Sequence, residues 1–235
     1  MTGHKHMRYL IGNWKSYNTI SQTHIWLSEF GQTRLPKVNL TTIICAPFTN
    51  LAEVNRLINQ ENLPLQVGAQ NVSAETEGKH TGEVTARMLS ELTRYCLVGH
   101  SERRREFSET SAMVAQKVKR LLEESLVPIV CVDQPYLDEQ IRELLALQLP
   151  LATCVFAYEP VSAIGSGQAQ DASQAEVVAG KISFLTESQC PILYGGSVTP
   201  ENVGSYLAKQ HLDGVLVGTD SLTVPAFVKL MAAFV

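Results

Sequence analysis

The sequence predicts an α/β protein whose single domain is a closed (β/α)₈ barrel. Short apolar runs recur about eight times along the 235 residues, and stretches with helical spacing lie between them. Most of the runs do not alternate polar with apolar residues, which is typical of parallel strands buried on both faces. A chain of this length can bury one large core, although two small domains would also fit.

The expected strands are the apolar runs themselves. They cover residues 9–11, 41–46, 65–69, 95–98, 128–132, 153–157, 192–194 and 214–217. An open, doubly wound sheet is the alternative architecture. It requires a G-x-G-x-x-G turn after an early strand, and the sequence contains no such turn.

Four of the expected helices have recognisable starts. Residues 49–50 precede one apolar series with helical spacing, and Ser111 opens another. The tetrapeptide SQAE at residues 173–176 predicts a capping box. The pair Thr-Pro at residues 199–200 predicts an N-cap followed by proline at the first helical position.

The domain organisation follows from what separates these elements. No linker rich in proline, glycine or serine divides the chain, and no stretch is long and apolar enough to span a bilayer. Residues 1–6 are polar and lack the apolar region of a signal peptide. We therefore expect an N-terminal extension over residues 1–6 and one barrel domain over residues 7–235.

Composition excludes several classes of function. The formal net charge is −4 without a long basic run, so the sequence lacks the electrostatic signature of a nucleic-acid-binding protein. The arginines at residues 103–105 lie between glutamates, which indicates an ion-paired helix start. The histidines are scattered without ligand spacing, so we expect no metal site.

The cysteines indicate a reducing compartment. Their number is odd, none forms a C-x-x-C pair, and each lies in or beside an apolar run. Buried, reduced thiols in a cytoplasmic protein explain this pattern best. The five are Cys45, Cys96, Cys131, Cys154 and Cys190.

Candidate functional residues follow the expected strands, where a barrel of this type places its active site. Lys15, His100 and Glu159 supply an ammonium, an imidazole and a carboxylate, and the glycine-rich segments 165–167 and 195–197 can present backbone N–H groups to phosphate. Together these groups suffice to move a proton between adjacent carbons of a phosphorylated carbonyl compound. Each residue alone is more often a salt-bridge partner, a structural histidine or a turn glycine. The pattern by itself therefore predicts no more than a phosphate-binding barrel enzyme.

Seven short motifs add a more specific indication. They are GNWK at 12–15, GAQN at 68–71, TGE at 81–83, GHSERR at 99–104, AYEPV at 157–161, AIG at 163–165 and YGGSV at 194–198. The same motifs occur in this order in triosephosphate isomerases, and the chain resembles that family from Met7 nearly to its C-terminus. The resemblance implies the TIM barrel of that family.

The resemblance also implies roles for single residues. Glu159 corresponds to the catalytic base, and His100 to the neutral electrophile that hydrogen-bonds the carbonyl and enediolate oxygens. This pairing is a known property of the family, not a deduction from the residues. Lys15 corresponds to the cation beside the substrate, Asn13 to a pocket-lining residue, and Glu102 to a partner of Lys15 and His100.

The phosphate site is implied in the same way. Residues 160–167 resemble a closing lid that excludes water, with Gly165 donating its N–H to the phosphate. Ser197, Gly218 and Thr219 would complete the site through backbone N–H groups. The implied reaction is the interconversion of dihydroxyacetone phosphate and D-glyceraldehyde 3-phosphate in glycolysis and gluconeogenesis, with no cofactor and no metal.

The chain departs from the family pattern at several places, and one of the milder changes is Gln168 where a lysine is common. Ser162 replaces a lid tryptophan, from which we expect slower or less complete closure. Residues 218–221 read GTDS instead of GGAS, which places the carboxylate of Asp220 near a phosphate dianion. Pointed inward, it would weaken phosphate binding; pointed outward, it would be harmless. Residues 131–134 read CVDQ instead of CIGE, and a single helix over residues 137–147 follows; the sequence offers no functional reason for these changes.

The resemblance further implies a homodimer in which the loop before Thr81 enters the partner's pocket. Lys79, His80 and Ser16 differ from the usual residues at that contact. Two alternative functions stay open at this point. One is isomerisation of another small ketose phosphate, such as a tetrulose phosphate, and the other is a non-catalytic barrel that serves as a scaffold.

Overall fold

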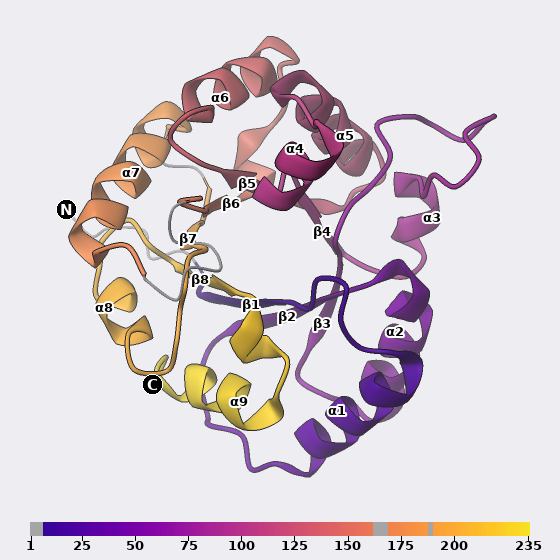
Figure 1. The fold of residues 1–235 in the computed structure, drawn as a ribbon, viewed down its shortest axis with the longest axis vertical. Helices are drawn as coiled ribbons and strands as arrows, with labels where there is room; N and C mark the ends of the chain where they lie inside the picture. Colours follow the sequence, from indigo (N-terminus) through magenta and orange to yellow (C-terminus); the bar gives the residue numbers. More distant parts are fainter. Residues whose placement is uncertain (1–6, 162–168, 188–189) are drawn as a thin grey trace.

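The computed structural model of the chain describes residues 7–161, 169–187 and 190–235. It shows a closed barrel of parallel strands in the order β1 to β8, with helices around the outside (Figure 1). The predicted fold class is confirmed. Residues 1–6 lie outside the described part of the chain, so their separation from the barrel domain stays a prediction.

The observed strands agree with the expected ones to within two residues at either end. They are β1 (Tyr9–Asn13), β2 (Thr41–Ala46), β3 (Gln66–Ala69), β4 (Tyr95–Val98), β5 (Val127–Val132), β6 (Val155–Tyr158), β7 (Ile192–Tyr194) and β8 (Gly214–Val217).

The helices follow the strands along the chain, and the last of them comes after β8. They are α1 (Ile20–Gln32), α2 (Leu51–Gln60), α3 (Ala86–Ser90), α4 (Ser101–Phe107), α5 (Ser111–Glu123), α6 (Leu137–Ala146), α7 (Ala172–Leu185), α8 (Val203–Leu207) and α9 (Val224–Ala232). Within the described residues, no helix has the length and apolar character needed to cross a membrane.

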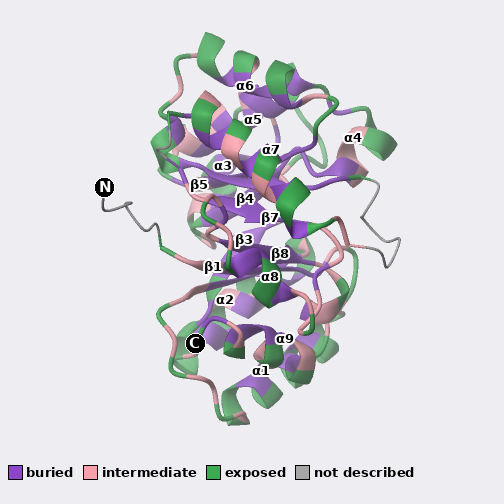
Figure 2. Cartoon of the chain, turned by 90° about the vertical axis from the view of Figure 1, so that its left-hand side faces the viewer, coloured by how far each residue is buried: buried purple, intermediate pink, exposed green. Residues whose placement is uncertain are grey.

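The strands separate two apolar cores. Ile11 on β1 and Ile43 on β2 belong to a cluster that fills the barrel, whereas their neighbours Leu10 and Ile44 belong to the larger cluster shared with the helices. Successive side chains of a strand point to opposite faces, so both faces of each strand are buried. Figure 2 shows this burial in the strands and on the inner faces of the helices.

Two of the predicted helix starts are wrong. The side chain of Asp171 accepts hydrogen bonds from the backbone N–H groups of Ser173 and Gln174, so α7 begins at Ala172 and not with a capping box at 173–176. The second wrong start is the one predicted at Thr199 and Pro200, because α8 begins only at Val203. The Asn202 side chain accepts a hydrogen bond of 2.9 Å from the Thr199 N–H, which stabilises a turn before the helix.

The other expected helices are present. Helix α2 begins at Leu51 after a short 3₁₀ turn over Phe48–Asn50, and α5 begins at Ser111 with Thr110 as its cap. Helix α6 occupies the predicted segment after β5. All five cysteines are free and buried, as predicted.

Candidate active site

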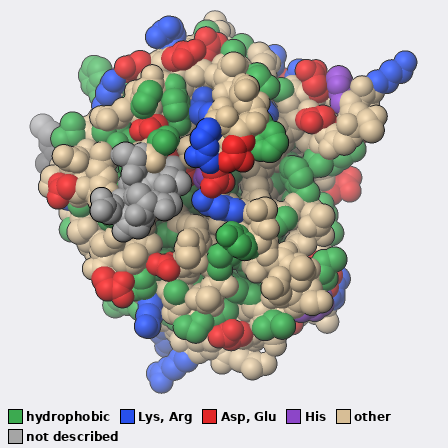
Figure 3. All heavy atoms as spheres, in the orientation of Figure 1, with side chains coloured by type: hydrophobic (Ala, Val, Ile, Leu, Met, Phe, Trp, Pro, Cys, Tyr) green, Lys and Arg blue, Asp and Glu red, His purple; other side chains and the backbone are tan. Residues whose placement is uncertain are grey.

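The described candidate residues meet at the carboxyl ends of the strands. A cavity of about 370 Å³ is lined by Asn13, Lys15, His100, Glu159, Ser197, Gly218 and Thr219. These residues come from the ends of β1, β4, β6, β7 and β8. On the face drawn in Figure 3, basic and acidic side chains gather near the centre of the barrel. Gly165 and Ser162 lie outside the described residues, so their predicted contacts are not part of this geometry.

Glu159 is a buried carboxylate at the end of β6. Its place continues the inward-facing series of Val155 and Ala157, and only 2% of the residue is exposed. One carboxylate oxygen lies 3.3 Å from His100 Nε2, and the other lies 3.5 Å from the backbone nitrogen of Ser101. Burial raises the pKa of Glu159, although the neighbouring His100 ring and the Ser101 N–H act in the opposite direction.

The glycine that follows β7 leaves room for this carboxylate. A Cβ atom at Gly195 would lie 2.8 Å from Cγ of Glu159, which is closer than carbon atoms normally approach. The sequence suggested Gly195 only as part of a phosphate-binding segment. The structure therefore gives this glycine a steric role beside the carboxylate.

His100 is held by the start of the helix that follows it. It is the N-cap residue of α4, and its Nδ1 atom accepts a hydrogen bond of 3.2 Å from the Glu102 N–H. A ring nitrogen that accepts from a backbone N–H carries no proton, so this contact favours the neutral tautomer with hydrogen on Nε2. That hydrogen is then available to a group in the cavity.

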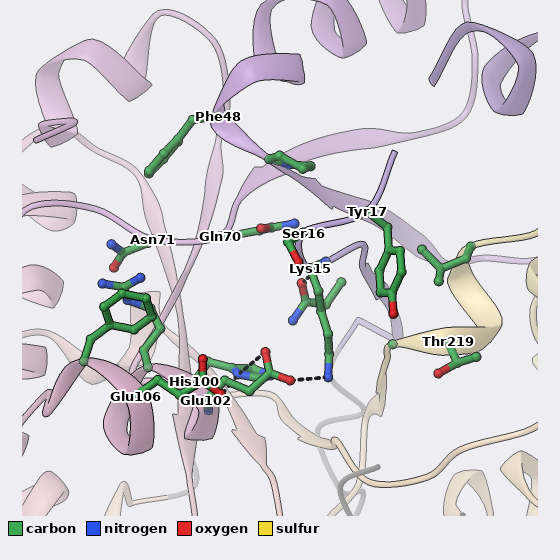
Figure 4. Close-up of a pocket in the computed structure, with 16 residues that line it drawn as sticks. Lys15, Ser16, Tyr17, Phe48, Gln70, Asn71, His100, Glu102, Glu106 and Thr219 are labelled. Carbon is green, nitrogen blue, oxygen red and sulfur yellow. Dashed lines mark hydrogen bonds and ion pairs between the residues drawn. The ribbon is translucent and has the colours of Figure 1, made fainter. Parts of the chain in front are cut away.

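Lys15 is fixed from two directions. Its backbone has a φ of 50°, in the left-handed region, and its N–H donates to Asn13 Oδ1 at 2.9 Å. Its ammonium lies 2.6 Å from Glu102 Oε1, as the dashed line in Figure 4 marks. Lys15 and His100 therefore share Glu102 as a neighbour, because His100 Nδ1 lies 3.6 Å from its other oxygen.

The pKa values of Glu102 and Glu159 are shifted in opposite directions. Partial burial alone would raise the pKa of Glu102, but the hydrogen bond and charge of Lys15, with the neighbouring His100 ring, outweigh it and lower the pKa. The pKa of Glu159 is instead raised by burial. Such a difference between neighbouring acids is common at sites of proton transfer.

Trp14 joins two loops of the site, a contact that its motif in the sequence did not indicate. Its side chain is fully buried, and its indole N–H donates to the Ser221 carbonyl at 3.1 Å. It thereby ties the loop after β1, which carries Lys15, to the loop after β8. The available signal was a large aromatic residue inside an otherwise polar segment.

The segments after β7 and β8 form the opposite side of the cavity. Gly218 lies against Lys15, since a Cβ atom there would be 3.4 Å from the lysine Cε. Thr219 is exposed, and Asp220 is partly buried and lines the cavity. Burial raises the pKa of Asp220, and the negative charge of Glu201 acts in the same direction.

A second hollow adjoins the first. It has a volume of about 680 Å³ and shares Asn13, Lys15, His100, Gly218 and Thr219 with it. In the part of the chain that the structure describes, no group of three His, Cys, Asp or Glu side chains is placed to hold a metal ion.

Comparison with known proteins agrees with this geometry. The family model described as triosephosphate isomerase matches residues 8–234. A triosephosphate isomerase of Thermus thermophilus is 40% identical over 94% of this chain and 96% of its own length. One of Dehalococcoides mccartyi is 38% identical over 95% of this chain and 96% of its own. One of Gloeobacter violaceus is 38% identical over 95% of this chain and 97% of its own.

The family match covers nearly the whole chain, and the match to curated relatives extends over almost their entire length. The observed barrel is the architecture that the resemblance implied. The chain belongs to the triosephosphate isomerase family.

Proposed function

We propose that Glu159, His100 and Lys15 carry out the reaction of this family in a cavity closed on one side by Ser197, Gly218 and Thr219. The reaction is the interconversion of dihydroxyacetone phosphate and D-glyceraldehyde 3-phosphate, a step of glycolysis. The observation that carries the assignment of roles is the contact between the Glu159 carboxylate and His100 Nε2, at 3.3 Å, beside the Lys15 ammonium.

Glu159 is the base in this proposal. It removes a proton from the carbon next to the carbonyl group, and the electron pair of that C–H bond forms the C=C bond of an enediolate. The protonated carboxyl group then returns a proton to the neighbouring carbon, so no net proton is gained or lost. A buried carboxylate with a raised pKa suits this exchange better than an exposed one.

His100 and Lys15 stabilise the intermediate. The Nε2–H group of His100 donates to the carbonyl oxygen, on which negative charge develops, and it can pass a proton between the two oxygens of the enediolate. The ammonium of Lys15 adds a fixed positive charge, and Glu102 holds it at the cavity wall at 2.6 Å. Both groups are in place before the reaction begins, which is how preorganised sites lower a barrier.

The phosphate group occupies the other side of the cavity. Backbone N–H groups of Ser197, Gly218 and Thr219 bind its oxygens in this proposal, together with that of Gly165. Support comes from the shared cavity wall formed by the first three residues.

Steady-state conversion of D-glyceraldehyde 3-phosphate tests the assignment. Replacing the base in Glu159→Gln should lower kcat by roughly a thousandfold, because the amide cannot accept the proton. The matched control is Glu91→Gln, an exposed glutamate at the end of α3, which should leave kcat unchanged. Equal rates for wild type and Glu159→Gln would refute the proposal.

The same assay tests how many carbon atoms the substrate has. We propose a three-carbon substrate, so a four-carbon ketose phosphate should give a far lower kcat/KM. A non-catalytic barrel is disfavoured because the carboxylate, imidazole and ammonium lie within contact distance of one another or of a shared partner.

We also propose a homodimer. The second hollow, beside the active site, has an exposed aromatic rim: Tyr17 is 58% exposed and Phe107 61%. The loop between β3 and α3 projects from the body of the chain, and its residues 75–83 are exposed (Figure 1). Insertion of this loop into the second hollow of another copy would bury both surfaces.

Sedimentation velocity at micromolar concentration tests the dimer. Phe107→Glu at the rim should dissociate it, whereas Phe184→Glu, at an exposed phenylalanine on α7, should not. A monomeric wild type would refute this part of the proposal. The proposed location is the cytoplasm, which five buried, free cysteines support because that compartment keeps thiols reduced.

A further inference from the structure

Asp133 is an acidic residue beside the proposed base, and neither the sequence motifs nor the proposed mechanism uses it. It follows the last residue of β5, and β5 pairs with β6 so that Val132 lies opposite Tyr158. Asp133 therefore lies in register with Glu159. It also continues the inward-facing series of Ile129 and Cys131, and only 7% of the residue is exposed.

Both oxygens of this carboxylate accept backbone hydrogen bonds. Oδ1 accepts from the N–H of Gln134 at 2.7 Å, and Oδ2 accepts from the N–H of Val161 at 3.0 Å. The first bond is local and belongs to the turn after β5. The second joins two strand ends that are 28 residues apart in sequence. In the described part of the chain, Asp133 forms no ion pair. The backbone N–H groups of Gln134 and Val161 are the hydrogen-bond donors to its carboxylate there.

The bond to Val161 fixes the backbone that carries Glu159. The Glu159 N–H donates to the Val132 carbonyl at 2.8 Å. Pro160 has no N–H and a restricted φ, so the next donor along the chain is that of Val161. The segment 159–161 is thus tied to β5 on both sides of the Glu159 side chain. A hydrogen bond to a carboxylate is stronger than one to a neutral acceptor.

We propose that Asp133 is a positioning residue for the catalytic base: its carboxylate holds the Val161 amide and thereby the orientation of Glu159. This inference rests on the proposed role of Glu159. A carboxylate that moves by a fraction of an ångström no longer meets the reacting C–H bond correctly, so kcat should suffer while substrate affinity does not.

Asp133→Asn tests this role. The amide keeps the size of the side chain but has only one acceptor oxygen for the two backbone donors, so one of the two hydrogen bonds is lost. We expect kcat to fall about tenfold, with KM and the inhibition constant of inorganic phosphate unchanged within about twofold. The matched control is Asp213→Asn, which alters a carboxylate that accepts the Ile192 N–H at 3.0 Å, before β8 at the opposite end of the barrel. It should leave kcat unchanged.

A double-mutant cycle separates positioning of the base from general damage. In the Glu159→Gln background no base remains to be positioned, so adding Asp133→Asn should cause no further loss. A further tenfold loss in that background would overturn the inference, because it would show that Asp133 acts on something other than Glu159. If Asp133→Asn does not fold, Val161→Pro removes the same bond from the donor side at a residue that is 45% exposed.

The two proposals fail differently. A normal kcat for both Asp133→Asn and Val161→Pro, together with an inactive Glu159→Gln, would refute the role of Asp133 alone. An active Glu159→Gln would refute the assignment of the base itself.

Discussion

The ends of β1, β4 and β6 form one side of the active-site cavity, and the ends of β7 and β8 form the other. The residues on the two sides are held in place by different kinds of contact. On the first, which we call the proton-transfer side, Lys15, His100 and Glu159 are held by side-chain contacts of 2.6–3.6 Å that join three strands. On the second, the anion side, Gly218, Thr219 and Asp220 are placed by their backbone, and Thr219 is exposed.

The difference bears on one departure of this chain from the family pattern, the one at residues 218–221. A change at His100 or Glu159 would leave a polar or charged partner unpaired in a buried place, which is costly, and a change at Lys15 would leave Glu102 unpaired at a partly exposed one. On the anion side, backbone N–H groups do the proposed binding, and a side chain there can change while the backbone keeps its path. The departure at residues 218–221 falls on this side.

The largest effect is expected on the proton-transfer side. Lys15→Met removes the ammonium and leaves Glu102 without its 2.6 Å partner, so kcat/KM should fall about a hundredfold. Lys37→Met, at an exposed lysine, is the matched control and should have no effect. A loss of less than threefold for Lys15→Met would mean that this contact contributes little to the reaction.

A smaller effect is expected where the two sides touch. Gly195→Ala places a Cβ atom 2.8 Å from Cγ of Glu159 and must displace it, so kcat should fall about tenfold. Gly204→Ala in α8 meets no atom within 4 Å and should leave kcat unchanged. Equal kcat for both variants would show that the base tolerates displacement.

Lowering the pH should reduce kcat/KM by protonating the Glu159 carboxylate. Glu159 works as a base only when ionised, and burial raises its pKa, so kcat/KM should fall about tenfold per pH unit once the pH drops below that raised value. Carbon-13 NMR of labelled glutamate in the free protein isolates the group from the titration of substrate phosphate. Glu159 should titrate above the ordinary glutamate value and Glu102 below it. The reverse order would contradict the described electrostatics.

The smallest effect is expected on the anion side. Asp220 lines the cavity, so its carboxylate lies close to a phosphate that binds there. Asp220→Asn should lower the inhibition constant of inorganic phosphate about two- to threefold, since partly screened charges interact weakly. Asp138→Asn on α6 changes the net charge equally at an exposed site and is the control. Unchanged inhibition would mean that Asp220 points away from the anion.

The sequence predicted the strands well because most of them are buried on both faces and read as largely apolar runs, with the exposed Gln66 at the start of β3 as an exception. It predicted the starts of α7 and α8 poorly, since several polar residues compete for each cap. Asp171 caps α7 before the Ser173 hydroxyl could, and Asn202 holds a turn where the proline at 200 suggested a helix. Local hydrogen bonds of this kind depend on backbone geometry that a residue pattern does not specify.

The position of the site was predictable from the motifs, because they follow successive strands and a barrel gathers strand ends on one rim. The contact of Glu102 with Lys15 and His100 was implied by the resemblance, but two other contacts that orient the site were not predictable. The Asp133–Val161 bond and the steric demand at Gly195 join segments that are far apart in sequence, and only the register of β5, β6 and β7 brings them together.

The most direct test of the central claim follows hydrogen during the reaction. D-glyceraldehyde 3-phosphate is converted by the wild-type protein in deuterium oxide, and dihydroxyacetone phosphate is examined by NMR. If the Glu159 carboxyl group carries the proton in transit, part of it exchanges with solvent and the product contains carbon-bound deuterium. Over the same time, Glu159→Gln should give roughly a thousandfold less conversion and correspondingly little deuterium. Complete conversion without any carbon-bound deuterium would indicate a direct hydrogen shift between the two carbons and would contradict the account.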